Sequence, residues 1–297
     1  MKRPPHTEAR WFDFYELAKP RIVGMVLVTT ATGFLVAGPA WTGFALWGRL
    51  ALTLLGTGLA AAGAAVLNNY LERDTDARMP RTRLRALPAG RIEPAVALAY
   101  GVLLVLWGVV LLATLVNLLS AFVALLTAFL YVLVYTPLKK ITWLNTPIGA
   151  IPGALPPVIG WAAGADSLGP GAWALFAILF LWQHPHFYAI AWMYRDDYRA
   201  AGYKMLSVID PTGHRVFRQA ILFSLALIPA SIVLSALGLS GQLYLIGAVF
   251  LGSALLAATL HFAQHRQRAD ARRVLLASVV YLPLLLALII LDAGFAR

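Results

Sequence analysis

The chain has 297 residues, of which 60% are hydrophobic and only 12% are charged, about half the charged fraction of an ordinary soluble domain. This composition excludes a soluble globular fold, since it leaves too little polar surface, and predicts a lipid bilayer as the solvent. The net charge of +11 lies in short loops between apolar runs and so indicates membrane topology rather than nucleic-acid binding, and the absence of cysteine excludes disulfides, thiolate nucleophiles and cysteine-ligated metals.

The predicted elements are helical throughout. Residues 1–20 contain acidic residues and no apolar core, which argues against a secretory signal or a transit peptide. The aromatic run at 11–15 predicts a short anchor at the membrane interface, on the cytoplasmic side, and Pro20 is placed to open the first span. Nine stretches are apolar enough to cross a bilayer: 21–39, 50–70, 95–115, 118–135, 145–163, 171–190, 217–237, 241–261 and 274–293. We therefore expect an all-α integral membrane protein, a single multi-pass domain over 1–297.

The basic residues segregate to one side of the membrane if nine spans are counted. Of the 24 Lys and Arg residues, all but Arg49 and Arg297 fall in the N-terminal segment or in alternate loops. The positive-inside rule places that side in the cytoplasm. We expect a protein of a prokaryotic cytoplasmic (inner) membrane, with its N-terminus inside and its C-terminus outside.

The second span ends in a run of polar residues. Asn68, Glu72 and Asp76 are spaced four apart, so on a helix they form one oxygen-bearing stripe, whereas Asp74 points elsewhere. Oxygen ligands of this kind suit Mg²⁺ together with a substrate phosphate. The alternative is a solvated helix end with local ion pairs to Arg73 and Arg78. Polar groups at the edge of a membrane bundle are functional candidates by default, which favours the metal–phosphate site.

The loop at 79–91 is rich in arginine. Arginine binds phosphate oxygens in bidentate fashion, so one or two of these residues are candidates for holding a diphosphate. The alternative is that they serve only to set topology.

The predicted span at 145–163 is rich in proline and glycine. Such a helix should be kinked or broken, which a bilayer tolerates only against protein or a cavity. Two interpretations stay open: an adaptation to close packing, and the wall of a cavity.

The sixth predicted span carries His184 and His186, and an acidic pair, Asp196 and Asp197, follows it. If the helix continues, His186 and Asp197 share one face, about 16 Å apart along the axis. Histidine commonly holds heme iron, so either imidazole could orient a porphyrin. The alternative is that both histidines form hydrogen bonds between helices.

At this point the sequence resembles a known family. The spacing of Asn68, Glu72 and Asp76 is similar to the first acidic motif of the UbiA-type membrane prenyltransferases. Further similar segments follow in order along nearly the whole chain, at 17–21, 68–91, 135–140, 142, 145, 160–161, 183–187 and 196–206. The His-Pro-His-Phe and Asp-Asp-Tyr segments resemble the branch that farnesylates heme. Two departures are Glu72, where Asp is usual, and Ala86, where Pro is expected; neither removes a charge.

The resemblance implies a nine-helix UbiA-type bundle that binds an isoprenyl diphosphate through Mg²⁺. It puts Asp196 and Asp197 in the place of a second acidic motif, and since adjacent residues do not share a helix face, Asp197 is favoured. The implied metal ligands are Asn68, Glu72, Asp76, Asp196 and Asp197. The implied diphosphate-binding residues are Arg81, Arg85, Lys139, Arg195 and Lys204.

The implied reaction transfers a farnesyl group from farnesyl diphosphate to the vinyl group of heme b, with addition of water, and gives heme o and diphosphate. Its catalytic residues would be Asn68, Glu72, Asp76 and Asp197, with heme held by His184 or His186. Heme A synthase or terminal-oxidase assembly proteins are candidate partners. One rival is a UbiA-type enzyme with a quinone-precursor or chlorophyll-type acceptor, which should need neither histidine. Another is a transporter or a non-catalytic heme carrier, which leaves the acidic stripe unexplained.

Overall fold

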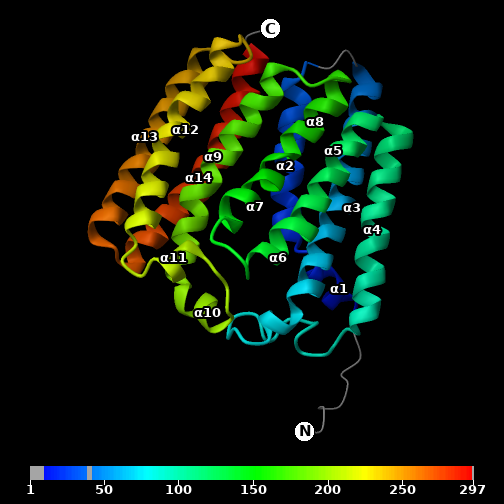
Figure 1. Cartoon of the computed structure of the whole chain (residues 1–297). Helices are drawn as coiled ribbons and strands as arrows, with labels where there is room; N and C mark the ends of the chain where they lie inside the picture. The colour runs from blue at the N-terminus through cyan, green and yellow to red at the C-terminus, as the bar shows by residue number, and fades with distance from the viewer. Residues whose placement is uncertain (1–9, 39–41, 296–297) are drawn as a thin grey trace.

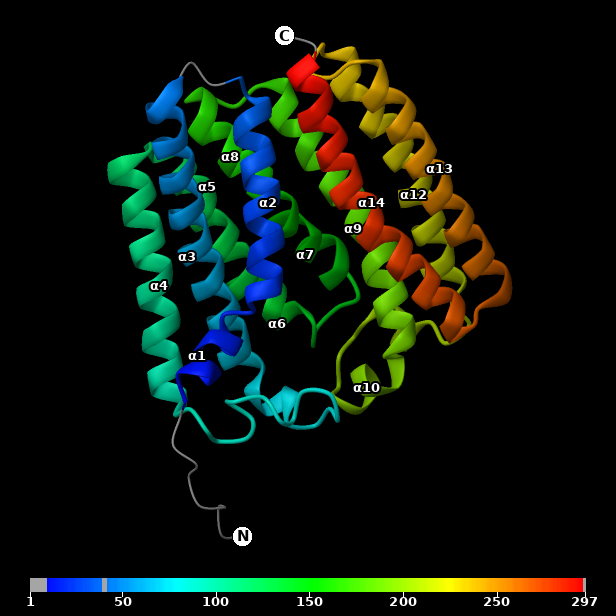
Figure 2. The same ribbon diagram turned by 180° about the vertical axis from the view of Figure 1, so that it is seen from behind.

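The computed structural model describes residues 10–38 and 42–295, and in this part of the chain it contains helices and no strand (Figure 1). The helices form two groups that lie side by side (Figures 1 and 2). The first group contains α2 (Pro20–Val36), α3 (Gly43–Asp76), α4 (Pro94–Leu115), α5 (Leu118–Phe129), η1 (Leu130–Tyr135), α6 (Thr136–Leu138), α7 (Asn145–Ala154) and α8 (Pro156–Ala165). The second contains α9 (Pro170–Met193), α12 (His214–Ala236), α13 (Gln242–His265) and α14 (Arg268–Phe295). Three short helices, α1 (Trp11–Leu17), α10 (Arg195–Ala200) and α11 (Leu206–Ile209), complete the fold.

The described residues provide eight segments that are long and apolar enough to cross a membrane, and a ninth if α1 and α2 count as one bent span. The segment of α5, η1 and α6 forms one of the eight, and α7 with α8 forms another. The prediction of about nine spans is confirmed. The predicted end of the first span, residue 39, lies outside the described residues.

The entry into the bundle is bent. Pro20 occupies the first turn of α2, as predicted, and the preceding Lys19 has a left-handed backbone with φ 51°. The axes of α1 and α2 differ by 50° as a result. Trp11, Phe12 and Tyr15 on α1 are exposed, which fits the expected interfacial anchor.

Helix α3 is longer than its predicted span. Its 34 residues extend about 50 Å at 1.5 Å per residue, whereas the hydrocarbon core of a bilayer is about 30 Å thick. The polar last turns, which carry Glu72 and Asp76, can therefore lie beyond the hydrocarbon while remaining helical.

The proline-rich span is broken at Leu155, where α7 ends and α8 begins, as predicted. Glycine here permits contact between backbones: a Cβ on Gly160 would overlap the carbonyl oxygen of Thr30, and one on Gly33 would overlap that of Pro157. On α7, a Cβ on Gly153 would overlap the side chain of Gln183. These contacts favour close packing as the reason for the glycines at these positions.

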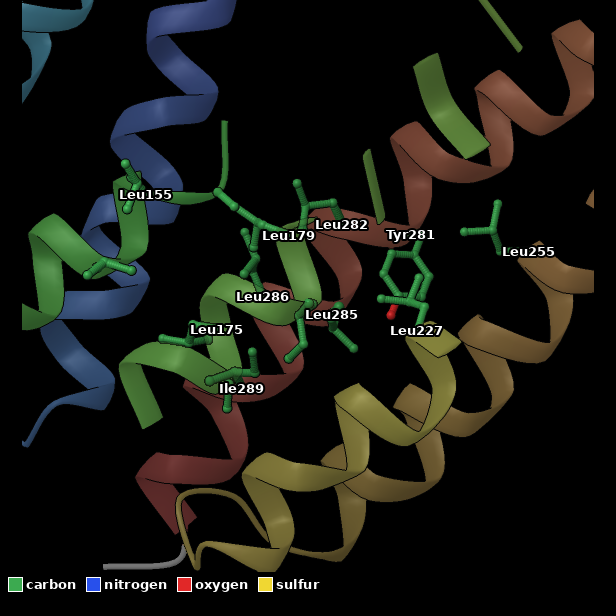
Figure 3. Packing of buried hydrophobic residues seen from close by; sticks show 14 of the residues in the cluster. Leu155, Leu175, Leu179, Leu227, Leu255, Tyr281, Leu282, Leu285, Leu286 and Ile289 are labelled. Carbon is green, nitrogen blue, oxygen red and sulfur yellow. The ribbon is translucent and has the colours of Figure 1, made fainter. Parts of the chain in front are cut away.

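The second group packs through large side chains instead (Figure 3). Leu175 and Leu179 of α9 lie against Leu282 and Leu286 of α14. Tyr281 is 1% exposed, and its hydroxyl forms a hydrogen bond with Ser231 of α12, at 3.0 Å. This buried polar pair lies within an apolar cluster and is satisfied.

The basic loops gather at one end of the bundle, which we call the basic end: α1 with residues 77–93, 139–144, 194–213 and 266–267. Figures 1 and 2 show α1, α6 and α10 at this end, Figure 1 also shows α11 there, and both show the C-terminal end of α14 at the other end. Arg91 joins the loop at 77–93 to α1 through a 2.8 Å salt bridge with Asp13. The basic end thus brings together loops that are far apart in the sequence.

Candidate active site

The acidic stripe lies on the last turns of α3 and is buried. Asn68, Glu72 and Asp76 are 1%, 6% and 2% exposed, whereas the side chain of Asp74 is 78% exposed. The structure thus confirms the predicted shared face. It does not support the alternative of a solvated helix end, because the salt-bridge contact of Arg73 is with Asp74 rather than with the stripe.

Each carboxylate of the stripe faces a cation. Lys139 donates from Nζ to Glu72 Oε1 at 2.7 Å, and Arg85 donates from Nη1 to Asp76 Oδ2 at 2.7 Å. Lys139 follows α6, and Arg85 lies in the loop at 77–93. Buried charges require partners of this kind, so the two loops and α3 form one charged cluster.

Lys19 completes the stripe, although sequence reasoning did not select it as a site residue. It donates from Nζ to Asn68 Oδ1 at 2.6 Å, and Asn68 in turn donates from Nδ2 to Thr136 Oγ1 at 2.9 Å. The left-handed backbone at Lys19 places this lysine at the elbow between α1 and α2. An ionisable residue at the edge of an apolar span was the available signal.

Aromatic residues surround Lys139. Its Nζ lies 4.6 Å from the ring centre of Tyr135 and 5.9 Å from that of Tyr203. Burial disfavours the charged form of Lys139, but the Glu72 carboxylate and the neighbouring tyrosines outweigh it and hold the pKa of Lys139 well above its ordinary value. Lys139 is therefore a permanent cation. Burial and the Glu72 carboxylate also raise the pKa of Tyr203, which stays neutral.

The second acidic segment contributes one residue. Arg81 Nε lies 4.0 Å from Asp197 Oδ2, and its guanidinium lies over the rings of Tyr194 and Tyr198, at 5.3 and 5.2 Å. Asp196 points away: its side chain is 78% exposed and pairs with Arg199. The two neighbouring aspartates therefore face different ways, as expected from their adjacent positions: Asp197 lies near Arg81, and Asp196 faces solvent.

The expectation that His186 and Asp197 share one helix face is wrong. Helix α9 ends at Met193, because Tyr194 leaves helical geometry with φ −113° and ψ 23°, and a separate helix, α10, begins at Arg195. Asp197 reaches the loop at 77–93 through this break rather than by continuing the face of α9.

The side chains of two predicted diphosphate-binding residues have other surroundings. The guanidinium of Arg195 lies over the ring of Trp192, at 4.8 Å. Lys204 has an exposed side chain, but its backbone N–H donates to the carbonyl of Lys139 at 2.7 Å. Lys204 therefore positions Lys139 through its main chain.

The two histidines of α9 lie within the span and face different neighbours. His184 is fully buried; its Nδ1 donates to the Phe180 carbonyl at 2.7 Å, and its ring stacks on Phe223 with centres 3.6 Å apart. Its Nε2 has no hydrogen-bond partner among the described residues. His186 is partly exposed and pairs through Nδ1 with Ser278 Oγ at 2.9 Å. Only His186 is accessible without rearrangement of its neighbours.

The chemistry of the charged cluster fits a magnesium–diphosphate ligand. Its acidic groups and the amide of Asn68 offer hard oxygen donors, which Mg²⁺ prefers. Its cations, Lys139, Arg81 and Arg85, suit phosphate oxygens. The Tyr203 hydroxyl is buried beside the Glu72 carboxylate, where it can donate to that carboxylate or to a ligand bound there.

The model of the UbiA prenyltransferase family matches residues 26–286. The chain belongs to the UbiA prenyltransferase family. It is 48% identical over 286 residues to a protein of Solibacter usitatus named protoheme IX farnesyltransferase, with 94% of this chain and 98% of that protein covered. A protein of the same name from Salinibacter ruber is 46% identical, with 95% and 98% covered.

Solved structures of UbiA proteins share the fold. A digeranylgeranylglyceryl phosphate synthase superimposes with a TM-score of 0.79 at 17% identity, covering 95% of this chain and 98% of that one. A UbiA homolog from Archaeoglobus fulgidus, bound to DMAPP and Mg²⁺, gives 0.68 at 17% identity, covering 95% and 99%. The all-helical UbiA fold expected from the sequence is confirmed.

Proposed function

We propose that this chain transfers the farnesyl group of farnesyl diphosphate to a vinyl group of heme b and releases diphosphate. The observation that carries this proposal is the buried stripe of α3 with its matched cations, in a chain whose full-length relatives are named protoheme IX farnesyltransferase. The stripe and its cations support binding of a diphosphate, and the names of the relatives support heme as the acceptor.

The residues have distinct roles in this proposal. Bound Mg²⁺ would be held by Asn68, Glu72, Asp76 and Asp197 and would supply positive charge to the departing diphosphate. Lys139, Arg81 and Arg85 bind the diphosphate oxygens, exchanging their carboxylate partners for the substrate. Such preorganised charges stabilise the transition state because they need no reorganisation during the reaction. Asp196, which pairs with Arg199, and Arg195, which lies over Trp192, have no role in this proposal.

The bonds change as follows. The allylic C–O bond of farnesyl diphosphate breaks, and its electron pair leaves with the diphosphate. The π electrons of the heme vinyl group form the new C–C bond with the allylic carbon. Water then adds to the remaining cationic carbon and releases a proton to solvent, which gives a hydroxyethylfarnesyl side chain. The apolar bundle around the site keeps bulk water from the allylic cation until the C–C bond has formed.

We assign heme orientation to His186 rather than to His184. His186 is partly exposed, and its level is about 10 Å from the end of α9, at seven residues and 1.5 Å per residue. His184 is closed off by Phe223 and Phe180. The chain as a whole would act as one domain in the cytoplasmic membrane, with the basic end inside.

The test is an assay of purified protein in detergent with heme b, farnesyl diphosphate and Mg²⁺, with farnesylated heme measured by mass. Asp76→Asn should lower the rate by about 10²–10³, the scale for loss of one transition-state contact. The matched control is Asp74→Asn, on the same turn but exposed, which should keep the parental rate. His186→Ala should weaken heme binding more than His184→Ala.

Two outcomes contradict the proposal. Conversion of a quinone precursor but not of heme would show that the acceptor is wrong. No transfer to any acceptor, together with heme binding that Asp76→Asn leaves unchanged, would indicate a heme carrier.

A further inference from the structure

A second cluster of potential metal ligands lies at the turn between α13 and α14, apart from the acidic stripe. His261 and His265 are one helical turn apart at the end of α13, and Asp270 lies in the first turn of α14. One ligand atom from each residue lies within 4.8 Å of the others, and this is the one such group found among residues 10–38 and 42–295. His261 Nε2 lies 3.3 Å from Asp270 Oδ1. Ligand atoms of a tetrahedral zinc ion are about 3.3 Å apart, because each lies about 2.0–2.1 Å from the metal.

The turn that carries these ligands is fixed from several sides. Arg266 closes α13 with a left-handed backbone, at φ 58°. Its carbonyl accepts a hydrogen bond from Trp192 Nε1 at 3.1 Å, and its guanidinium donates to the Thr212 carbonyl at 3.3 Å. The distance between the last turn of α13 and the first turn of α14 is therefore set by the fold, so the ligands are held in position before any ion binds.

The hydrogen bonds also orient the imidazoles. His265 Nδ1 lies 3.0 Å from the His261 carbonyl, which can only accept, so Nδ1 carries the proton and Nε2 has the free lone pair. Such a bond from the other ring nitrogen is the usual support of a metal-binding histidine. Asp270 is 3% exposed, while the two histidines are exposed, so the carboxylate forms the floor of the site and the open side faces solvent.

We propose that His261, His265 and Asp270 bind a divalent transition-metal ion, with Zn²⁺ as the expected ion, and leave a fourth position open to water. Two imidazoles and one carboxylate suit zinc, whereas Mg²⁺ prefers oxygen ligands alone. The ion would clamp α13 to α14 at the basic end. This proposal is independent of the farnesyl-transfer reaction.

Arg273 gives the site a distinctive property. Its Nη1 donates to Asp270 Oδ1 at 2.8 Å and lies 3.3 Å from His261 Nε2. A metal ion would have to displace this guanidinium from His261, and the positive charge of Arg273 would oppose the ion. Removing that charge should therefore tighten metal binding.

The test is titration of the purified protein with Zn²⁺, after removal of any affinity tag and with excess Mg²⁺ present to saturate the acidic stripe. One Zn²⁺ should bind per chain and raise the melting temperature. His261→Gln and His265→Gln should each weaken binding at least about tenfold, on the scale of changes at metal sites, and abolish the rise. Both residues are exposed, so folding should be preserved. Arg273→Gln should bind more tightly than the parent.

The control is His214→Gln, because His214 is also exposed and starts α12 at the same end of the bundle. It should bind Zn²⁺ as the parent does. Failure of the parent chain to bind Zn²⁺ would overturn the proposal. So would equal affinity in the parent, His261→Gln and His265→Gln, or weaker binding in Arg273→Gln.

Discussion

Glu72 and Lys139 form a buried salt bridge between α3 and the segment after α6. Their side chains are 8% and 15% exposed, and they meet at 2.7 Å. Withdrawing two charges from water is costly, and the cost is recovered only while both partners are present. The pair therefore has two functions in the proposal: it holds α3 against the segment after α6, and it keeps a cation ready for the diphosphate.

These two functions can be separated by substitution. Lys139→Gln should lower the rate of farnesyl transfer by about 10²–10³, and should also lower stability because the buried Glu72 carboxylate loses its salt-bridge partner. Adding Glu72→Gln should restore much of the melting temperature but none of the activity. Steady-state kinetics and thermal unfolding in detergent measure the two effects.

The neighbouring lysine provides the control for this pair of measurements. Lys140 is exposed, and Lys140→Gln should change neither the rate nor the melting temperature. If Lys139→Gln loses stability but keeps the parental rate, Lys139 has only a structural role.

The sequence predicted the site residues that share one element and missed those that depend on tertiary contacts. The stripe of α3 follows from helical spacing alone. The contact of Lys19 with Asn68, across 49 residues of sequence, depends on the elbow before α2, which no local pattern specifies. For the same reason, sequence alone did not distinguish Arg81 and Arg85, which reach carboxylates, from Arg195, which lies over Trp192.

At the scale of elements, α2 and α8 approach so closely at two glycines that no Cβ fits there. Gly33 faces the backbone of Pro157, and Gly160 faces that of Thr30. In lipid, where no hydrophobic effect drives helices together, small residues that permit such contact are a main source of association. This interface attaches the broken span to the rest of the first group.

Adding a methyl group at Gly33 tests the interface between α2 and α8. Gly33→Ala should destabilise the protein by about 1–3 kcal/mol, the usual cost of overpacking, because the new Cβ would overlap the Pro157 carbonyl. Gly24→Ala, on the same helix, is the control, since a Cβ there meets nothing within 4 Å. The melting temperature in detergent measures both. Equal stability of the two variants would show that α2 can shift away from α8 without cost.

Element types were predictable from the sequence, whereas element ends were less so. The proline and glycine content predicted a broken span, and the break between α7 and α8 lies at Leu155. The second span was predicted over 50–70, but α3 runs from Gly43 to Asp76, because a helix can continue into water after its apolar stretch ends. The end of α9 at Met193 has no proline or glycine to mark it, so it could not be predicted.

At the scale of the whole molecule, the distribution of charge defines two different ends. The loops at 77–93 and 194–213 carry many arginines, whereas the opposite end is poor in them. The positive-inside rule relates this asymmetry to orientation in the membrane, and from it we expect the charged cluster on the cytoplasmic side.

The absence of native cysteine makes this orientation directly measurable. Leu84→Cys introduces a thiol at an exposed position of the basic end, and Ser167→Cys introduces one at the opposite end, also exposed. A membrane-impermeant maleimide should label Ser167→Cys in intact cells with a permeabilised outer envelope, and Leu84→Cys only after the cytoplasmic membrane is opened. The reverse labelling pattern would show that the protein has the opposite orientation in the membrane.

The elbow at Lys19 gives the lipid headgroups an influence on the site. Trp11, Phe12 and Tyr15 are exposed on α1, and such aromatic side chains favour the polar boundary of a bilayer. The last carbonyl of α1, at Leu17, accepts a hydrogen bond from Asn69, and Lys19 contacts Asn68. The depth at which α1 lies is thus mechanically coupled to the acidic stripe. We therefore expect the thickness and headgroup composition of the surrounding membrane to influence the acidic stripe through α1.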